Sequence, residues 1–206
     1  MSDLNTRFRP EEMTTATGSG KWLGYQNVGI VDWESKSDLY DWADVYLIAK
    51  LKLEDSQYLQ DLKFVGSFDK EPNGNIKACT LLKRLYWLFD EIGFQGGPNV
   101  QGEMVDENGK SIDLVNHLNI NYVTDPLKPS MDYIVYIYKE LSKKDGKAYT
   151  TVFPKIAPNT PAGRKDLEGY INFMKSKNLI KEVEDGDTSA TSNGIISESP
   201  VSDNPF

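Results

Sequence analysis

Hydrophobic and polar residues alternate most regularly between Val45 and Leu53. One face of this segment is apolar and holds Val45, Leu47, Ala49, Leu51 and Leu53. The opposite face is aromatic and basic and holds Tyr46, Ile48, Lys50 and Lys52. A period of two that is sustained over nine residues predicts a β-strand with its apolar face in the core.

Other segments share the composition of strands. Residues 21–33 are aromatic and β-branched, and their two glycines suggest a bulge or bend that lets one strand serve both halves of a small barrel. Residues 58–68 are predicted as a third strand. Residues 132–140 and 147–153 are predicted as a long hairpin, because Asp145-Gly146 supplies a turn between them.

Two segments change to a helical period. Between Thr80 and Gly93 apolar residues recur every three or four positions, with Thr80 as the expected N-cap and Gly93 as a left-handed end. A second helix is predicted after Thr160, its cap, with Pro161 at the first position. Residues 114–123 are predicted as a further strand.

This order of elements predicts a mainly β fold. Three strands, a helix and then more strands are typical of an OB-fold-like five-stranded barrel with one helix between strands 3 and 4. An extended basic hairpin, a C-terminal helix and a disordered acidic tail complete the prediction. The expected organisation is a flexible N-terminal arm at 1–20, an OB-like domain at 21–181 and the tail at 182–206.

Composition fits a soluble globular protein. The chain has 206 residues, of which 39% are hydrophobic and 26% charged. No apolar run approaches membrane-spanning length, and the first ten residues lack the apolar segment of a signal peptide. A cytoplasmic location without a membrane partner is therefore expected. The single cysteine, Cys79, excludes an intramolecular disulfide framework.

The negative charge is concentrated at the C-terminus. The net charge is −8, and residues 182–206 hold six acids and no base, so the body is close to neutral. This segment has too few large apolar groups to offset its ordering entropy, which predicts disorder. Its end, Asp203-Asn204-Pro205-Phe206, has the form of a docking peptide, because Phe206 offers a ring and a terminal carboxylate to a basic-rimmed pocket. A solvated tail without a role is the alternative, as for acidic termini in general.

Aromatic and basic residues interleave on two of the predicted strand regions. Single-stranded nucleic acid requires rings that stack on bases and cations that neutralise phosphates. The candidate contact residues are Trp22, Tyr25, Trp33, Tyr46, Lys50, Lys52, Lys63, Tyr136, Tyr138, Lys139, Lys143, Lys144 and Lys147. An alternative stays open for each of them, because such rings often pack in a core and lysines at hairpin tips often protect sheet edges.

A near-neutral β-rich body followed by an acidic tail that ends in Asn204-Pro205-Phe206 resembles the single-stranded DNA-binding proteins of bacteria and bacteriophages. Bacterial members end in acids followed by Ile-Pro-Phe, so Asn204 departs from their pattern, and the body is more similar to the phage proteins. The resemblance implies sequence-independent coating of single-stranded DNA in the host cytoplasm. It also implies a tail that recruits replication, recombination and repair proteins and competes with DNA, and it is compatible with a homo-oligomer.

No enzymatic activity and no cofactor are expected. His117 and Cys79 are the only residues of their kinds, so no zinc site of histidines and cysteines can be assembled. A Mg²⁺ nuclease built from carboxylates is left open as an alternative, although no spacing among the 31 acids singles out a site. A phage structural or adaptor protein with a β-sandwich body is the other alternative.

Overall fold

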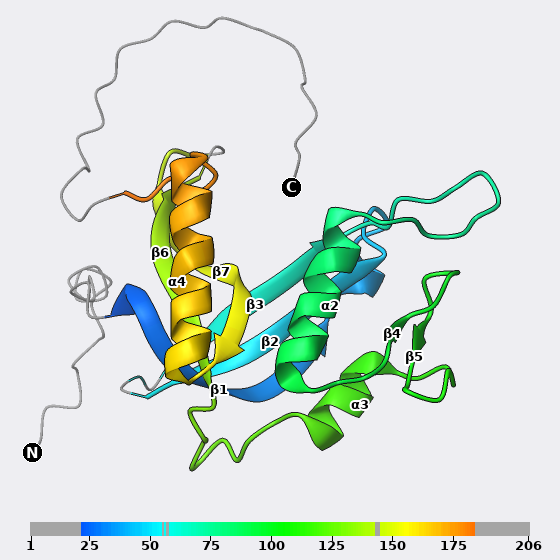
Figure 1. The fold of residues 1–206 in the computed structure, drawn as a ribbon, viewed down its shortest axis with the longest axis horizontal. Helices are drawn as coiled ribbons and strands as arrows, with labels where there is room; N and C mark the ends of the chain where they lie inside the picture. Colours follow the sequence, from blue (N-terminus) through cyan, green and yellow to red (C-terminus); the bar gives the residue numbers. More distant parts are fainter. Residues whose placement is uncertain (1–21, 55, 57, 143–144, 184–206) are drawn as a thin grey trace, which may run out of the picture.

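The computed structural model describes residues 22–54, 56, 58–142 and 145–183. The predicted N-terminal arm and all but the first two residues of the predicted tail lie outside these ranges. The described chain is mainly β, with a five-stranded antiparallel sheet, a two-stranded sheet and three α-helices (Figure 1). No helix in this part of the chain is long and apolar enough to cross a membrane.

Five strands form the large sheet. They are β1 (Gly24–Ser35), β2 (Val45–Leu53), β3 (Leu59–Gly66), β6 (Tyr133–Leu141) and β7 (Ala148–Pro158). Their order is β3-β2-β1-β6-β7, and the sheet curves so that its two edge strands, β3 and β7, approach each other. Among the described residues no backbone ladder joins these edges. The mainly β prediction is therefore confirmed, and the closed barrel is not.

β1 serves both halves of the sheet because it bends. Its first half pairs with β6 and its second half with β2, and a register shift between Ile30 and Asp32 marks a β-bulge. Gly29 lies beside the bulge, where a Cβ atom would stand 2.3 Å from the carbonyl oxygen of Ser130. Only glycine permits this close approach of two backbone segments. The bend that the sequence predicts in this strand is therefore present.

The main core lies between the sheet and α2 (Thr80–Ile92), which packs against β3 and β7. The buried side chains of α2 are Leu81, Leu85, Leu88, Phe89 and Ile92. Cys79 is the N-cap, one residue before the predicted Thr80, and its Sγ accepts a hydrogen bond from the backbone nitrogen of Leu82 at 3.5 Å. Gly93 ends the helix with a φ of 80°, as predicted.

The segment predicted as a strand at 114–123 is instead a helix, α3 (Leu114–Asn121). The Asp113 carboxylate caps it by accepting a hydrogen bond from a backbone N–H of the first turn. The side chain of Asn119 makes two hydrogen bonds with the backbone of Trp33, at 2.8 and 2.9 Å, which attach α3 to β1. The apolar residues of so short a segment fit the period of a helix and that of a strand equally well. The Asp113 cap and the hydrogen bonds of Asn119 favour the helix.

α4 (Pro161–Ser176) covers the side of β6 and β7 that faces away from the main core (Figure 1). As predicted, it begins after Thr160, whose hydroxyl accepts a hydrogen bond from the backbone nitrogen of Gly163 at 3.1 Å. A second apolar cluster forms beneath it from Ile134, Tyr136, Tyr138, Phe153, Ala157, Leu167, Ile171, Met174 and Ile180. The middle of β6 and the second half of β7 are thus covered on both faces, whereas the first residues of β7 are exposed.

Candidate nucleic-acid interface

The connection between β1 and β2, residues 36–44, presents large rings at the surface, and we call it the aromatic loop. Trp42 is 60% exposed and Tyr40 is 38% exposed. The ring of Tyr40 stacks on that of Tyr46 in β2, with centroids 5.0 Å apart and planes at 28°. The Trp42 ring centroid lies 6.1 Å from that of Tyr40. Three aromatic side chains therefore form a continuous patch that starts on the strand and extends into solvent.

Backbone hydrogen bonds hold the aromatic loop in place. A short 3-10 helix, η2 (Ser37–Leu39), opens the loop. The buried Ala43 donates its N–H to the carbonyl of Tyr40 at 3.0 Å, and the Ser67 hydroxyl donates to the carbonyl of Trp42. Because the backbone is already fixed, less conformational entropy is lost when a ligand contacts the rings.

A cluster of charges follows on β1, β2 and β3. The Lys50 Nζ lies 2.9 Å from an Asp61 carboxylate oxygen and 3.2 Å from a Glu34 carboxylate oxygen. The second Asp61 oxygen lies 3.8 Å from the Lys63 Nζ. Burial by itself would lower the pKa of Lys50, but its hydrogen bonds with Asp61 and Glu34 outweigh this and raise the pKa. Lys50 is thus held by two carboxylates, whereas the side chain of Lys63 is 51% exposed.

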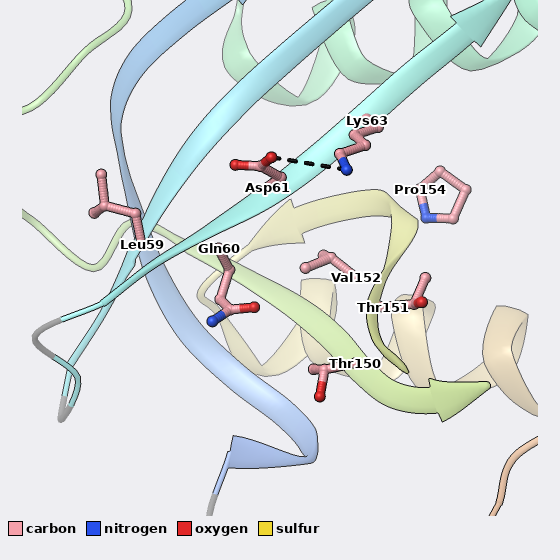
Figure 2. A pocket seen from close by; sticks show the side chains of 8 residues that line it. All are labelled: Leu59, Gln60, Asp61, Lys63, Thr150, Thr151, Val152 and Pro154. Atoms are coloured by element: carbon pink, nitrogen blue, oxygen red, sulfur yellow. Dashed lines mark ion pairs between the residues drawn. The ribbon is translucent and has the colours of Figure 1, made fainter. Parts of the chain in front are cut away.

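A hollow of about 500 Å³ opens between the edge strands β3 and β7, and we call it the edge hollow. Its lining consists of Leu59, Gln60, Asp61 and Lys63 from β3 and Thr150, Thr151, Val152 and Pro154 from β7 (Figure 2). Figure 2 shows the Asp61–Lys63 ion pair on the β3 side of the hollow. Amide, hydroxyl and ammonium groups offer donors to phosphates and bases, while the Asp61 carboxylate opposes an anion.

Exposed tyrosines precede both walls of the edge hollow. Tyr58 is 67% exposed and comes directly before β3. Tyr149 is 51% exposed near the start of β7, and its hydroxyl donates a hydrogen bond to the Asp145 carboxylate at 2.7 Å. Lys147, also exposed, comes directly before β7. An exposed tyrosine therefore lies next to the start of the wall that each edge strand contributes to the edge hollow.

The aromatic loop and the charge cluster share one face of the sheet, which we call the outer face, although Ile48 between them is fully buried. The edge hollow opens at the border of this face, because Asp61 and Lys63 reach it from the outer side while Val152 belongs to the main core. Tyr46, Ile48 and Lys50 alternate along one side of β2, and in register Ile48 lies opposite Lys63 and Lys50 opposite Asp61. The aromatic loop stacks on Tyr46 at one end. Asp61 and Lys63 line the edge hollow at the other end.

Three of the predicted contact residues are core residues. Trp33 is 1% exposed, and its indole N–H donates to the carbonyl of Tyr122 at 3.3 Å. Tyr136 and Tyr138 are buried beneath α4. A buried ring has no face free for a base, so the prediction that these three side chains contact nucleic acid is corrected.

Four predicted residues do lie on or beside the outer face: Tyr46, Lys50, Lys52 and Lys63. Two of these lysines are already engaged, Lys50 by its two carboxylates and Lys52 by a hydrogen bond from its ammonium group to the carbonyl of Ser56. Lys63 is consequently the most accessible of the three lysines.

The remaining predicted residues are found elsewhere. Trp22 and Tyr25 are half-buried at the start of β1. Lys139 is half-buried on β6, and Lys147 is exposed in the connection to β7. The predicted residues that lie outside the described ranges are Lys143, Lys144, Asp203, Asn204, Pro205 and Phe206.

Sequence reasoning missed two exposed rings of the outer face. Tyr40 and Trp42 belong to the connection 36–44, which has neither strand nor helix periodicity. Large aromatic side chains in a polar connection, without apolar neighbours at regular spacing, indicate exposed rings. Tyr40 and Trp42 could therefore have been identified from the sequence. Gln60, Thr150 and Thr151 carry no comparable signal, because their proximity depends on the curvature of the sheet.

Two features of the described chain bear on the alternative functions. Among these residues no group of three or more histidine, cysteine, aspartate or glutamate side chains is arranged to hold a metal ion. The second sheet consists of β4 (Gly97–Pro98) and β5 (Met104–Val105), which are too short to form the second layer of a β-sandwich.

Comparison of the chain with protein-family models, curated proteins and solved structures gave no match. The inference about function therefore depends on the residues and on their arrangement in this fold.

Proposed function

We propose that this protein is a non-catalytic, OB-fold-type protein that binds single-stranded DNA along its outer face. One observation carries the proposal, namely the strand order β3-β2-β1-β6-β7 with α2 in the connection between the third and fourth large strands. This order, with nearby but unpaired edge strands, supports the proposal because it is compatible with the partly open Greek-key barrel of OB-folds. Barrels of this kind bind oligonucleotides on the face of strands 2 and 3 and on the adjoining loops.

Each part of the outer face has a role in this proposal. Trp42 and Tyr40 stack on unpaired bases, which is a sequence-tolerant contact because every base has a π face. Lys63 pairs with a phosphate. The side chains of Gln60 and Thr151 in the edge hollow donate hydrogen bonds to the sugar-phosphate backbone.

The cellular role follows from sequence-independent binding. The protein coats single-stranded DNA during replication, recombination and repair, in the host cytoplasm if it is encoded by a bacteriophage. Residues Asp203 to Phe206 recruit replication or recombination proteins by offering the Phe206 ring to a pocket of the partner.

Titration of the full chain with oligo-dT, followed by tryptophan and tyrosine fluorescence, tests the proposal. Trp42→Ala removes an exposed ring from the aromatic loop and should weaken binding roughly five- to a hundredfold, because stacking on one base contributes about 1–3 kcal/mol. Phe173→Ala is the matched control, since Phe173 is a half-exposed ring on α4 that belongs neither to the aromatic loop nor to the lining of the edge hollow.

Two outcomes would contradict the proposal. The first is the absence of oligo-dT binding by the unmodified protein at low salt, where phosphate contacts are strongest. The second is an equal affinity of the Trp42→Ala and Phe173→Ala variants, which would remove the aromatic loop from the interface.

A further inference from the structure

A second, smaller hollow of about 150 Å³ lies at the corner where the start of β1, the end of β2 and the first turn of α4 meet, and we call it the corner hollow. Its lining consists of Trp22, Tyr25, Gln26, Asn27, Leu53, Glu54 and Arg164. The volume equals the share of about five water molecules in liquid water, which suits one small planar group. None of these residues belongs to the outer face as defined above.

The aromatic and cationic walls of the corner hollow contact neighbouring side chains. The Tyr25 ring packs against that of Tyr136, with centroids 4.8 Å apart. The guanidinium carbon of Arg164 lies 5.4 Å from the centroid of the Tyr25 ring. The Arg164 Nε donates a hydrogen bond to the Glu168 carboxylate at 2.9 Å, which orients the guanidinium plane. The Tyr25 ring is therefore in place before a ligand arrives, whereas the Arg164 side chain is 53% exposed and can adjust to the ligand.

The corner hollow also holds complementary polar groups. Besides the Nε–H group, the guanidinium of Arg164 carries four further N–H donors on its two terminal nitrogens. Glu54 supplies a carboxylate, which accepts hydrogen bonds. The side-chain nitrogen of Gln26 donates to the carbonyl of Leu23 at 3.0 Å, which orients the amide and leaves its oxygen as an acceptor.

The corner hollow combines aromatic rings, guanidinium donors and a carboxylate, and one base presents groups that match all three. Guanine presents two neighbouring acceptors, O6 and N7, that an arginine contacts in a bidentate manner. Its N1–H and N2–H groups lie on the adjacent edge and are donors that a carboxylate accepts. We propose that the corner hollow binds one unstacked guanine base, with Arg164 at O6 and N7, Glu54 at N1–H and N2–H, and Tyr25 or Trp22 against the ring face.

This inference rests on the proposed function, because the guanine is taken to belong to the bound single strand. The two hollows are neighbours through β2 and β3. Lys52, which precedes Leu53 of the corner hollow, pairs in register with Leu59 of the edge hollow. A strand that follows the outer face to the edge hollow therefore ends close to the corner hollow. The protein would bind any sequence but place a guanine at this position.

Competition between two oligonucleotides tests the inference with the full chain. The unmodified protein should bind a dT oligomer with one central dG about fivefold or more tighter than the all-dT oligomer, as expected for a bidentate arginine contact. Arg164→Gln and Glu54→Gln should abolish this preference, and Arg164→Gln should weaken binding of the all-dT oligomer no more than Lys165→Gln does. Lys165→Gln, which removes the same charge one residue further along α4, should retain the preference.

Free nucleotides separate this inference from the proposed function. If the protein fails to bind oligo-dT but its fluorescence still responds to dGMP, not to dTMP, and loses the response in Arg164→Gln, the proposed function fails and the guanine site stands. A strand-binding protein with no dG preference, or a preference that survives Arg164→Gln in a variant with an unchanged melting curve, would overturn the guanine site.

Discussion

The residue that most directly opposes anion binding on the outer face is Asp61. Its two oxygens contact Lys50 and Lys63, at 2.9 and 3.8 Å, so both ammonium groups share one carboxylate. Asp61→Asn should therefore tighten oligo-dT binding, and the plot of log affinity against log salt should become steeper by about 0.7 for each lysine that gains a phosphate. The measurement is a fluorescence titration at several salt concentrations.

Asp90→Asn is the control for this prediction, because Asp90 is an exposed acid on α2. It changes the net charge by the same amount but should leave the salt dependence unaltered. Equal tightening by both substitutions would show that the effect of Asp61 comes from overall charge and not from its contacts with Lys50 and Lys63.

Tyr138 gives the fold a pH-dependent contribution to stability. Burial, reinforced by the nearby Glu140, raises the pKa of Tyr138 to about 12. A tyrosine in the unfolded chain loses its proton near pH 10, so between about pH 10 and 12 the unfolded state binds fewer protons than the folded state. The contribution is thus complete below about pH 10 and is lost as the pH rises towards 12.

Tyr138→Phe should make the free energy of unfolding less sensitive to pH in this alkaline range, as measured by urea unfolding at a series of pH values. Tyr58→Phe, which alters an exposed tyrosine, should keep the pH dependence of the unmodified protein. Coincident curves for the Tyr138→Phe variant and the unmodified protein would contradict the assignment.

Among the elements, α4 packs on the sheet through a small stripe of buried apolar side chains. Ile171 is fully buried against β6 and β7, so Ile171→Ala leaves a cavity and should lower the free energy of unfolding by about 2–5 kcal/mol. The neighbouring Asn172 is exposed, and Asn172→Ala should change stability by no more than about 0.5 kcal/mol. Urea unfolding of both variants makes the comparison, and similar losses would show that α4 is not docked through this stripe.

The elements that the sequence predicts best are those with a long, unbroken period. β2 has its predicted bounds, and α2 has its predicted apolar stripe and its glycine end. Trp33 shows why the predicted site was less accurate. The bulge between Ile30 and Asp32 shifts the alternation by one residue, so that Trp33 faces the core together with Ile30. A two-residue period locates a strand but cannot locate such a bulge within it.

The parts of the site that were not predictable arise from the whole molecule. Alternation along 132–140 suggests one solvent-exposed face, and α4, from a later part of the chain, covers that face and buries Tyr136 and Tyr138. The edge hollow likewise joins 59–63 with 150–154, segments that meet because the sheet curves. Burial and concavity are thus properties of elements distant in sequence, and local patterns do not contain them.

Residues 182 and 183, which follow α4, are attached to β6 by hydrogen bonds. After α4 the Val183 N–H donates to the carbonyl of Lys139 at 3.0 Å. The Glu182 carboxylate accepts a hydrogen bond from the Tyr136 hydroxyl and lies 3.0 Å from the Lys175 Nζ. Glu182 is therefore part of the folded body, and a truncation that tests the acidic segment should retain residues 182 and 183.

Residues 184–206 follow this attachment to β6 in the sequence and contain five carboxylates and no basic residue. If the protein binds DNA as proposed, we expect these tethered carboxylates to compete with phosphates for Lys63 and the other cations at a high effective concentration. A chain that stops after Val183 should bind oligo-dT more tightly at low salt, and the gain should fade as salt screens the competition. A full-length chain with the five acids replaced by their amides should show the same gain, because charge and not length is the cause. Equal affinities of all three proteins at low salt would show that this segment does not compete with DNA.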